Sequence, residues 1–167
     1  YSKNLDIEKK YILKKEEDLE YLTEQNVKAR LRAARRYTRN HEYSMAMAEI
    51  EEILKIQPEN EEALKLKKDI KSGKLKADLY YALALQYYRN GAYKDALKKV
   101  KKARKLNRDH TDAEFLYHMI IARIFIDKGE YLQAKSHLLD AFKIYPENEE
   151  CLTLLNGVND LLKARGK

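Results

Sequence analysis

The sequence predicts an all-α protein, a solenoid of helical hairpins with three repeats plus extra and capping helices. Three observations support this prediction. Gly (5) and Pro (2) are scarce in 167 residues, although folds rich in turns use both residue types often. Apolar residues recur at helical spacing, and one such pattern returns three times along the chain. The hydrophobic fraction of 44% suits a folded core, despite a charged fraction of 37%.

Residues 3–26 form the first expected helix. It is charged and weakly amphipathic, with Leu5, Ile12 and Leu19 at heptad spacing and Leu22 adjoining them. Three heptad positions do not establish a coiled coil. The sequence leaves two arrangements open, in which this helix either continues into the first repeat as one rod or folds back over it as an N-terminal cap.

The repeated unit is clearest in its second half, which begins at Tyr43, Tyr93 and Tyr131. Each Tyr is followed by Ala three positions later and by apolar residues seven and ten positions later. A matching pattern starts thirteen residues before each Tyr, with Ala four and an aromatic seven positions after its start. These spacings place small residues on the facing sides of two antiparallel helices, so each unit is expected to be a helix-turn-helix hairpin.

The three units resemble the tetratricopeptide repeat family, whose 34-residue unit has this order of small and aromatic positions. They depart from it where the family has Trp in the first helix, since Arg30, Tyr80 and His118 stand there. The expected boundaries are an N-terminal charged helix at 1–26, repeats at 27–60, 77–110 and 111–148, an inserted helix and linker at 61–76, and a C-terminal capping helix at 149–167.

The connecting segments are irregular in length. Tyr43 to Tyr93 is 50 residues, so the sequence predicts an inserted helix over about 60–71 that ends at Ser72–Gly73. Thr111 to Glu114 reads as a capping box that lengthens the third repeat. After the last repeat, apolar residues at helical spacing predict a terminal helix, in which Cys151 is a small core residue.

The sequence contains no recognisable motif for metal binding or catalysis. The four histidines include no pair at a spacing of three or four, and there is no Cys-x-x-Cys, so no metal site is expected. His118 occupies a packing position and is interpreted as a half-buried aromatic substitute. There is no Gly-rich phosphate loop and no recognisable nucleophile motif. We therefore expect no enzyme, no catalytic residue and no cofactor.

The resemblance implies that the first helices of the hairpins line a concave groove. In that groove we expect a protein or peptide segment of acidic character, because guanidinium groups bind carboxylates in a fork and aromatic side chains add contact area. The function expected is a noncatalytic protein–protein interaction or scaffold module. The residues assigned to the groove are Arg32, Arg35, Arg39, Tyr81, Leu85, Tyr88, Arg89, Met119 and Arg123.

Two alternatives use other features of the chain. The net charge of +7 is concentrated in part on the second helix of the middle repeat, and this convex basic patch would suit nucleic acid or an anionic membrane surface. Without interleaved exposed aromatics, such partners are disfavoured. Self-assembly through a terminal helix, within a larger and even membrane-anchored protein, is the other alternative. The residues of the convex basic patch are Lys98, Lys99, Lys101, Lys102 and Lys105.

Compartment is the least constrained property. No stretch approaches the length of a membrane span, and no signal peptide is recognisable in the given chain. The chain begins at Tyr1 without methionine, which is expected of a soluble piece of a longer protein. Both the cytoplasm and the periplasm fit these observations.

Overall fold

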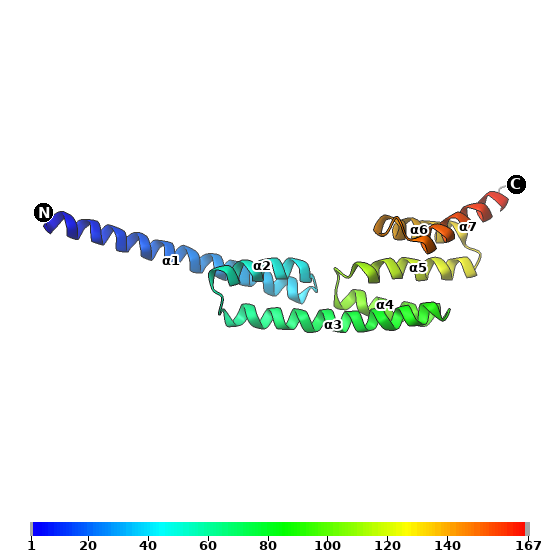
Figure 1. Cartoon of the computed structure of the whole chain (residues 1–167), viewed down its shortest axis with the longest axis horizontal. Helices are drawn as coiled ribbons and strands as arrows, with labels where there is room; N and C mark the ends of the chain where they lie inside the picture. The colour runs from blue at the N-terminus through cyan, green and yellow to red at the C-terminus, as the bar shows by residue number, and fades with distance from the viewer. Residues whose placement is uncertain (1, 166–167) are drawn as a thin grey trace. The chain divides into compact units, whose positions relative to one another are not determined.

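The structure of the protein is a computed structural model that describes residues 2–165, with side chains from residue 5 onward. This part of the chain contains seven α-helices and no strand (Figure 1), which confirms the all-α prediction. None of these helices combines the length and the apolar character needed to cross a membrane. The helices are α1 (Ser2–Arg39), α2 (Tyr43–Ile56), α3 (Glu61–Arg89), α4 (Tyr93–Leu106), α5 (Thr111–Asp127), α6 (Tyr131–Ile144) and α7 (Glu149–Arg165).

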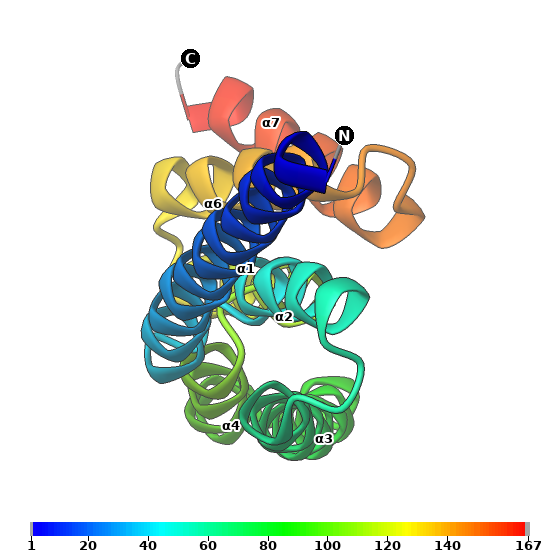
Figure 2. The same cartoon turned by 90° about the vertical axis from the view of Figure 1, so that its left-hand side faces the viewer.

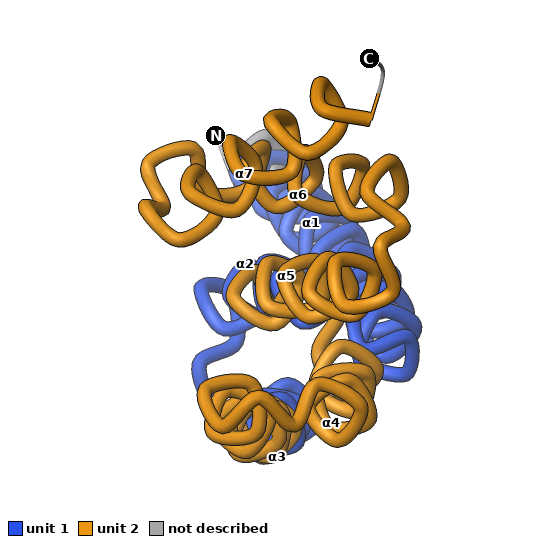
Figure 3. The backbone as a smooth tube through the Cα atoms, turned by 90° about the vertical axis from the view of Figure 1, so that its right-hand side faces the viewer, with its two compact units in different colours: residues 1–70 blue, residues 71–167 orange. Residues whose placement is uncertain are grey.

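The chain divides into two compact units, residues 1–70 and 71–167 (Figure 3). Unit 1 contains α1, α2 and the beginning of α3, and unit 2 contains the rest of α3 with α4 to α7. Each unit has its own buried apolar cluster. The boundary falls inside the segment 61–76 that the sequence analysis places between the first two repeats.

In unit 1, α1 and α2 pack against each other as a hairpin (Figure 2). Ala34 of α1 and Ala46 of α2 are completely buried, because small side chains allow the two helices to approach closely. Tyr43, Ile50 and Ile53 fill the remaining space from α2. The small-residue pattern in the sequence therefore marks the helix contact as expected.

The N-terminal half of α1 continues into the hairpin without interruption, so α1 is one rod of 38 residues and the fold-back arrangement is wrong. Its large apolar side chains lie in the open. Leu5, Ile12, Leu19 and Leu22 are between 54% and 66% exposed. The heptad residues thus form no contact that covers them within unit 1.

Helix α3 corrects the expected break at Ser72–Gly73. Its backbone is helical throughout Glu61–Arg89, so the inserted helix and the first helix of the second repeat are one element. A single Gly in a helix interior costs only about 1 kcal/mol relative to Ala. The neighbouring Lys, Leu and Ala residues are good helix formers, and they outweigh that cost.

Unit 2 repeats the packing of small residues between helices. Ala84, Ala96, Ala122 and Ala134 are completely buried, and larger apolar side chains fill the same cluster. Helix α7 packs on α6 and closes that end of the core. Cys151 is completely buried there, with its Sγ 3.4 Å from the carbonyl oxygen of Leu138. Cys151 is therefore a core residue, as the sequence predicts.

The turns within the hairpins share one backbone conformation. Gly91 and Gly129 have φ of +74° and +73°, and His41 occupies the same position in the first hairpin with φ of +59°. Left-handed backbone is costly for a residue with a Cβ atom. The His41 ring is anchored by a 3.0 Å hydrogen bond between its Nδ1 and the hydroxyl of Tyr43, which helps to hold the strained turn.

The turns between hairpins end in side-chain caps. The Asn60 and Asn148 side chains accept hydrogen bonds from the N–H groups of Ala63 and Cys151, at 3.0 and 2.9 Å. This shared cap explains why the chain has Asn at the same place in both Pro-Glu-Asn-Glu-Glu segments. Helix α5 is capped by the Nδ1 of His110 rather than by Thr111, so the expected capping box is wrong by one residue.

Candidate functional site

The arginine hollow is a depression of about 720 Å³ on the surface of α1 in unit 1. It brings together Arg32, Arg35 and Arg39, the three groove residues assigned to the first repeat, and all three are exposed. Among residues 5–165, no carboxylate forms an ion pair with Arg32, Arg36 or Arg39. The complete lining is Ala29, Arg32, Ala33, Arg35, Arg36, Arg39 and Asn40.

Arg35 differs from its neighbours because it already holds a carboxylate. Its Nε and Nη2 both donate to Glu62 at the start of α3, and the Nη2–Oε2 distance is 2.6 Å. The hydrogen bond from Arg35 lowers the pKa of Glu62 and keeps that carboxylate charged. This forked pair gives the geometry with which the arginine side of α1 binds one carboxylate group.

The unit 2 pocket has a volume of about 270 Å³ and contains five of the six groove residues assigned to the second and third repeats. Its walls come from α3, α5 and the beginning of α7, so residues far apart in the sequence meet here. The polar groups at its edge are Arg89, Asn148 and Glu150. The complete lining is Tyr81, Leu85, Tyr88, Arg89, Phe115, Leu116, Met119, Asn148 and Glu150.

Glu150 holds two of the groove residues together. It accepts a 2.6 Å hydrogen bond from the Tyr88 hydroxyl and forms a 2.8 Å ion pair with Nη2 of Arg123. Burial and the hydrogen bond to Glu150 raise the pKa of Tyr88, so its hydroxyl stays protonated. Burial acts to lower the pKa of Arg123, but the bonds to Glu150 and Tyr88 outweigh it and raise the pKa.

Two of the assigned residues are not exposed in the groove. The side chain of Met119 is 1% exposed and that of Tyr88 is 8% exposed. They were expected on an open inner face, but α7 begins next to them and its Glu150 engages Tyr88. Tyr81 and Leu85 are half-buried, and Arg89 is exposed. Arg89 thus supplies the guanidinium of this pocket, and it is open to solvent.

The two glutamates, Glu62 and Glu150, were not predicted from the sequence, although a signal was present. Arg35 and Arg123 each lie eight residues before a repeat Tyr, and Glu62 and Glu150 each lie four residues after a repeat Pro. The same pair therefore forms twice, once in each unit. Its consequence is that Arg35 and Arg123 are already bound to carboxylates of the chain itself.

Three of the five lysines of the convex basic patch on α4 already have a partner within the chain. Lys98 forms a 3.1 Å ion pair with Asp95, and the ammonium groups of Lys99 and Lys102 lie 6.0 and 5.4 Å from the ring centre of Tyr80. Lys99 is half-buried. The other four lysines of the patch are exposed.

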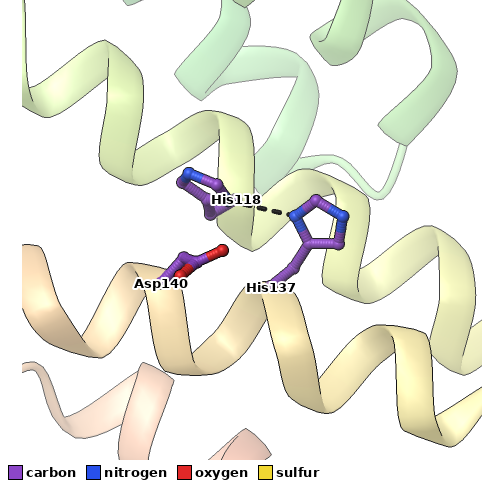
Figure 4. Close-up of side chains that lie close together, drawn as sticks. All are labelled: His118, His137 and Asp140. Atoms are coloured by element: carbon purple, nitrogen blue, oxygen red, sulfur yellow. Dashed lines mark hydrogen bonds between the residues drawn. The ribbon is translucent and has the colours of Figure 1, made fainter.

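A histidine pair joins α5 to α6 in unit 2. The Nδ1 atoms of His118 and His137 are 3.0 Å apart, and Asp140 lies on the same side of α6 as His137 (Figure 4). His118 is half-buried and in contact with aromatic rings, as the sequence predicts. The pairing itself was missed, because it joins residues 19 positions apart on two helices rather than neighbours on one helix.

The chain is similar to one protein family and to a solved structure. A family model described as the Fis1 C-terminal tetratricopeptide repeat matches residues 34–76. The solved structure titled "Crystal structure of MamA protein" matches with 15% sequence identity and a TM-score of 0.34, covering 83% of this chain and 89% of that one. No curated protein sequence matches the chain.

Proposed function

From the premise that this chain is a tetratricopeptide-repeat protein, we propose that it is a protein-binding module that holds an acidic segment of a partner in the arginine hollow of α1. The observation that carries this proposal is that Arg32, Arg36 and Arg39 line one hollow and that, within residues 5–165, none of the three is paired with a carboxylate, whereas their neighbour Arg35 is paired with Glu62. Repeat solenoids commonly use such extended surfaces for binding.

The chemistry of the hollow favours carboxylates. Guanidinium groups are planar and always charged, so they bind carboxylates in forked pairs. The Arg35–Glu62 pair is an example of this binding on the same surface. Ala29 and Ala33 add a floor of small side chains, over which the backbone of a partner can approach closely. An acidic segment therefore fits both the charge and the shape of the hollow.

A second contact surface for a partner is the unit 2 pocket. Its half-buried Tyr81 and Leu85 offer apolar contact, and the exposed Arg89 offers a charge at the edge. This combination suits an apolar side chain followed by an acidic one. Because Arg123 is held by Glu150, it supports the pocket wall and is not counted among the binding groups.

The proposal is tested with a fluorescein-labelled peptide of alternating Glu and Leu residues, whose binding is measured by fluorescence anisotropy. We expect the Arg32→Gln/Arg39→Gln variant to bind about tenfold more weakly than the unaltered chain, since two forked carboxylate contacts are removed. The matched control is Lys101→Gln/Lys105→Gln, which removes the same charge from the exposed convex basic patch. This control should change the affinity less than about twofold, within the range of distant surface charges.

Equal losses in the two variants would show that the peptide senses only net charge, and the arginine hollow would then be rejected. A larger loss in the lysine variant, with competition by random-sequence RNA, would favour the nucleic-acid alternative instead. The unit 2 pocket is tested by replacing Leu with Ala in the peptide. The resulting loss of affinity should disappear in Leu85→Ala, and an undiminished loss would remove the pocket from the binding surface.

A further inference from the structure

The strongest unassigned cluster in the molecule is the one formed by His118, His137 and Asp140. One possible ligand atom from each of the three lies within 4.8 Å of those of the other two. His137 and Asp140 are three residues apart on α6, which places them on one side of that helix, facing His118 of α5 (Figure 4). The cluster therefore bridges the two helices of one hairpin.

The distance between the two rings suits a shared cation. Zn²⁺ binds histidine nitrogens at about 2.0–2.1 Å in a tetrahedral arrangement, which puts two such nitrogens about 3.3–3.4 Å apart. The Nδ1 atoms of His118 and His137 are 3.0 Å apart, so a shift of about 0.3–0.4 Å would admit the ion. The two rings need no change of helix position for this.

The other nitrogen of His118 has the partner that a metal-binding histidine usually has. Its Nε2 lies 3.3 Å from Oε1 of Glu114, one turn earlier on α5. A carboxylate in this position fixes the ring and its tautomer, so the lone pair of the remaining nitrogen points toward the ligand site. Here that nitrogen is Nδ1, which faces His137.

Glu114 is in turn fixed by a second residue. The Nε and Nη2 atoms of Arg104 both donate to its carboxylate, and the Nη2–Oε1 distance is 2.9 Å. The guanidinium of Arg104 also lies 3.8 Å from the ring centre of Tyr117. A continuous set of contacts thus orients His118. The positive charge of Arg104 is paired with the carboxylate of Glu114, which lies between Arg104 and His118.

The surroundings protect the cluster but leave it reachable. The Phe125 ring stacks on His137 with centroids 5.8 Å apart, and Tyr117 meets both imidazoles edge-on. The side chain of Asp140 is 41% exposed and pairs with Lys143 at 2.8 Å. A surface pair of this kind is weak, so Asp140 can exchange its lysine partner for a cation.

We propose that His118, His137 and Asp140 form a binding site for a divalent transition-metal cation of the zinc type, with Glu114 as the positioning residue for His118. Two imidazoles and one carboxylate suit zinc and its neighbours better than magnesium or calcium, which favour oxygen ligands. With three ligands from the chain, one position is left for water or a further ligand. The bound cation would link α5 to α6 and stabilise the hairpin.

The test is titration of the full chain, free of any polyhistidine tag, with Zn²⁺ in a calorimeter and with Co²⁺ in a visible-absorption spectrometer. We expect one equivalent of Zn²⁺ to bind, and Co²⁺ to give the absorption of a tetrahedral site. At about 100-fold excess over Kd, Zn²⁺ should raise the midpoint of thermal unfolding by about 5 °C or more. Mg²⁺ and Ca²⁺ at the same concentration should leave the midpoint unchanged.

Three variants and one matched control separate the site from general surface binding. His137→Gln should abolish stoichiometric binding, Asp140→Asn should weaken it at least about tenfold, and Glu114→Gln should weaken it about 10- to 100-fold. The control is Asp95→Asn, because Asp95 also pairs with a lysine three residues later but has no histidine beside it in the described contacts. Its affinity should equal that of the unaltered chain.

Circular dichroism of each variant shows whether the helices are retained. The proposal is overturned if the unaltered chain binds no Zn²⁺, or if Asp140→Asn and Asp95→Asn bind it equally well. Retention of full affinity and of the Co²⁺ spectrum by the Glu114→Gln variant would overturn the role given to Glu114. Because the cluster shares no residue with the arginine hollow, these results are independent of the peptide-binding experiment.

Discussion

Replacing Gly73 by Ala tests whether α3 is one helix. Gly73 lies well inside Glu61–Arg89 and has helical backbone. In the interior of a helix, Gly is less favourable than Ala by about 0.8–1.0 kcal/mol, chiefly because it leaves more freedom in the unfolded chain. The Gly73→Ala variant should therefore be more stable by up to about 1 kcal/mol, which corresponds to about 2–4 °C in the unfolding midpoint.

Two other glycines calibrate the result in the same protein. Gly157 is helical, exposed and without any atom within 4 Å of an added Cβ, so Gly157→Ala should also stabilise. Gly91 has the same open surroundings but a φ of +74°, so Gly91→Ala should cost about 1–2 kcal/mol. The two control substitutions are expected to change the stability in opposite directions. The direction of the change in Gly73→Ala therefore shows which backbone conformation Gly73 has.

The measurement is urea unfolding followed by circular dichroism, with the slope of the transition compared between variants. If α3 ended at Ser72–Gly73, Gly73 would take the left-handed conformation common after a helix. Gly73→Ala would then destabilise the protein as Gly91→Ala does. That result would refute the continuous helix and restore the boundary that the sequence suggests.

Four further predictions concern the ion pairs and the core. Glu62→Gln frees Arg35, so it should tighten binding of the Glu-Leu peptide about two- to fivefold in the anisotropy assay. The lowered pKa of Glu62 means that its pair with Arg35 stabilises the fold above about pH 4.3 and that this stabilisation is lost as the pH falls through the lowered pKa. The difference in unfolding midpoint between the unaltered chain and Glu62→Gln should accordingly narrow as the pH falls through the lowered pKa of Glu62, and a constant difference would contradict the ion pair. Glu150→Gln leaves half-buried Arg123 without its carboxylate and should cost about 1 kcal/mol in urea unfolding, whereas no loss would mean that the pair is not formed in solution. Ala134→Leu forces a larger side chain between α5 and α6 and should cost about 1–3 kcal/mol in the same assay, and a neutral result would contradict the close approach of those helices.

The hairpins could be predicted from the sequence because their contacts repeat at fixed spacing. Ala34 and Ala46, like Ala122 and Ala134, are small at positions where two helices touch, and this requirement is local to each repeat. The left-handed turns at Gly91 and Gly129 follow from the same local requirement. Such features depend on neighbours within about 15 residues, so a periodic pattern reveals them.

Features that depend on contacts between residues far apart in the sequence could not be predicted in this way. Tyr88 and Met119 were expected to be open, but α7 begins beside them and contributes Glu150. His118 and His137 come together only because two helices are in register across the hairpin. The continuity of α3 depends on helix propensities. One Gly costs only about 1 kcal/mol relative to Ala, so its presence alone does not show whether the helix ends there.

Residues 5–26 share a continuous helix with residues 27–39, but the two halves have different sources of stability. One face of the second half packs against α2, whereas the side chains of the first half are mostly exposed and the contacts described for them are local ones along α1. Most helical stability in proteins comes from tertiary packing, so a helical segment without it is less stable, and its helix–coil transitions take on the order of a microsecond. The rate of amide hydrogen exchange along α1 should therefore be high before Val27 and fall steeply after it. A protease could remove residues 5–26 while the hairpin of α1 and α2 stays folded.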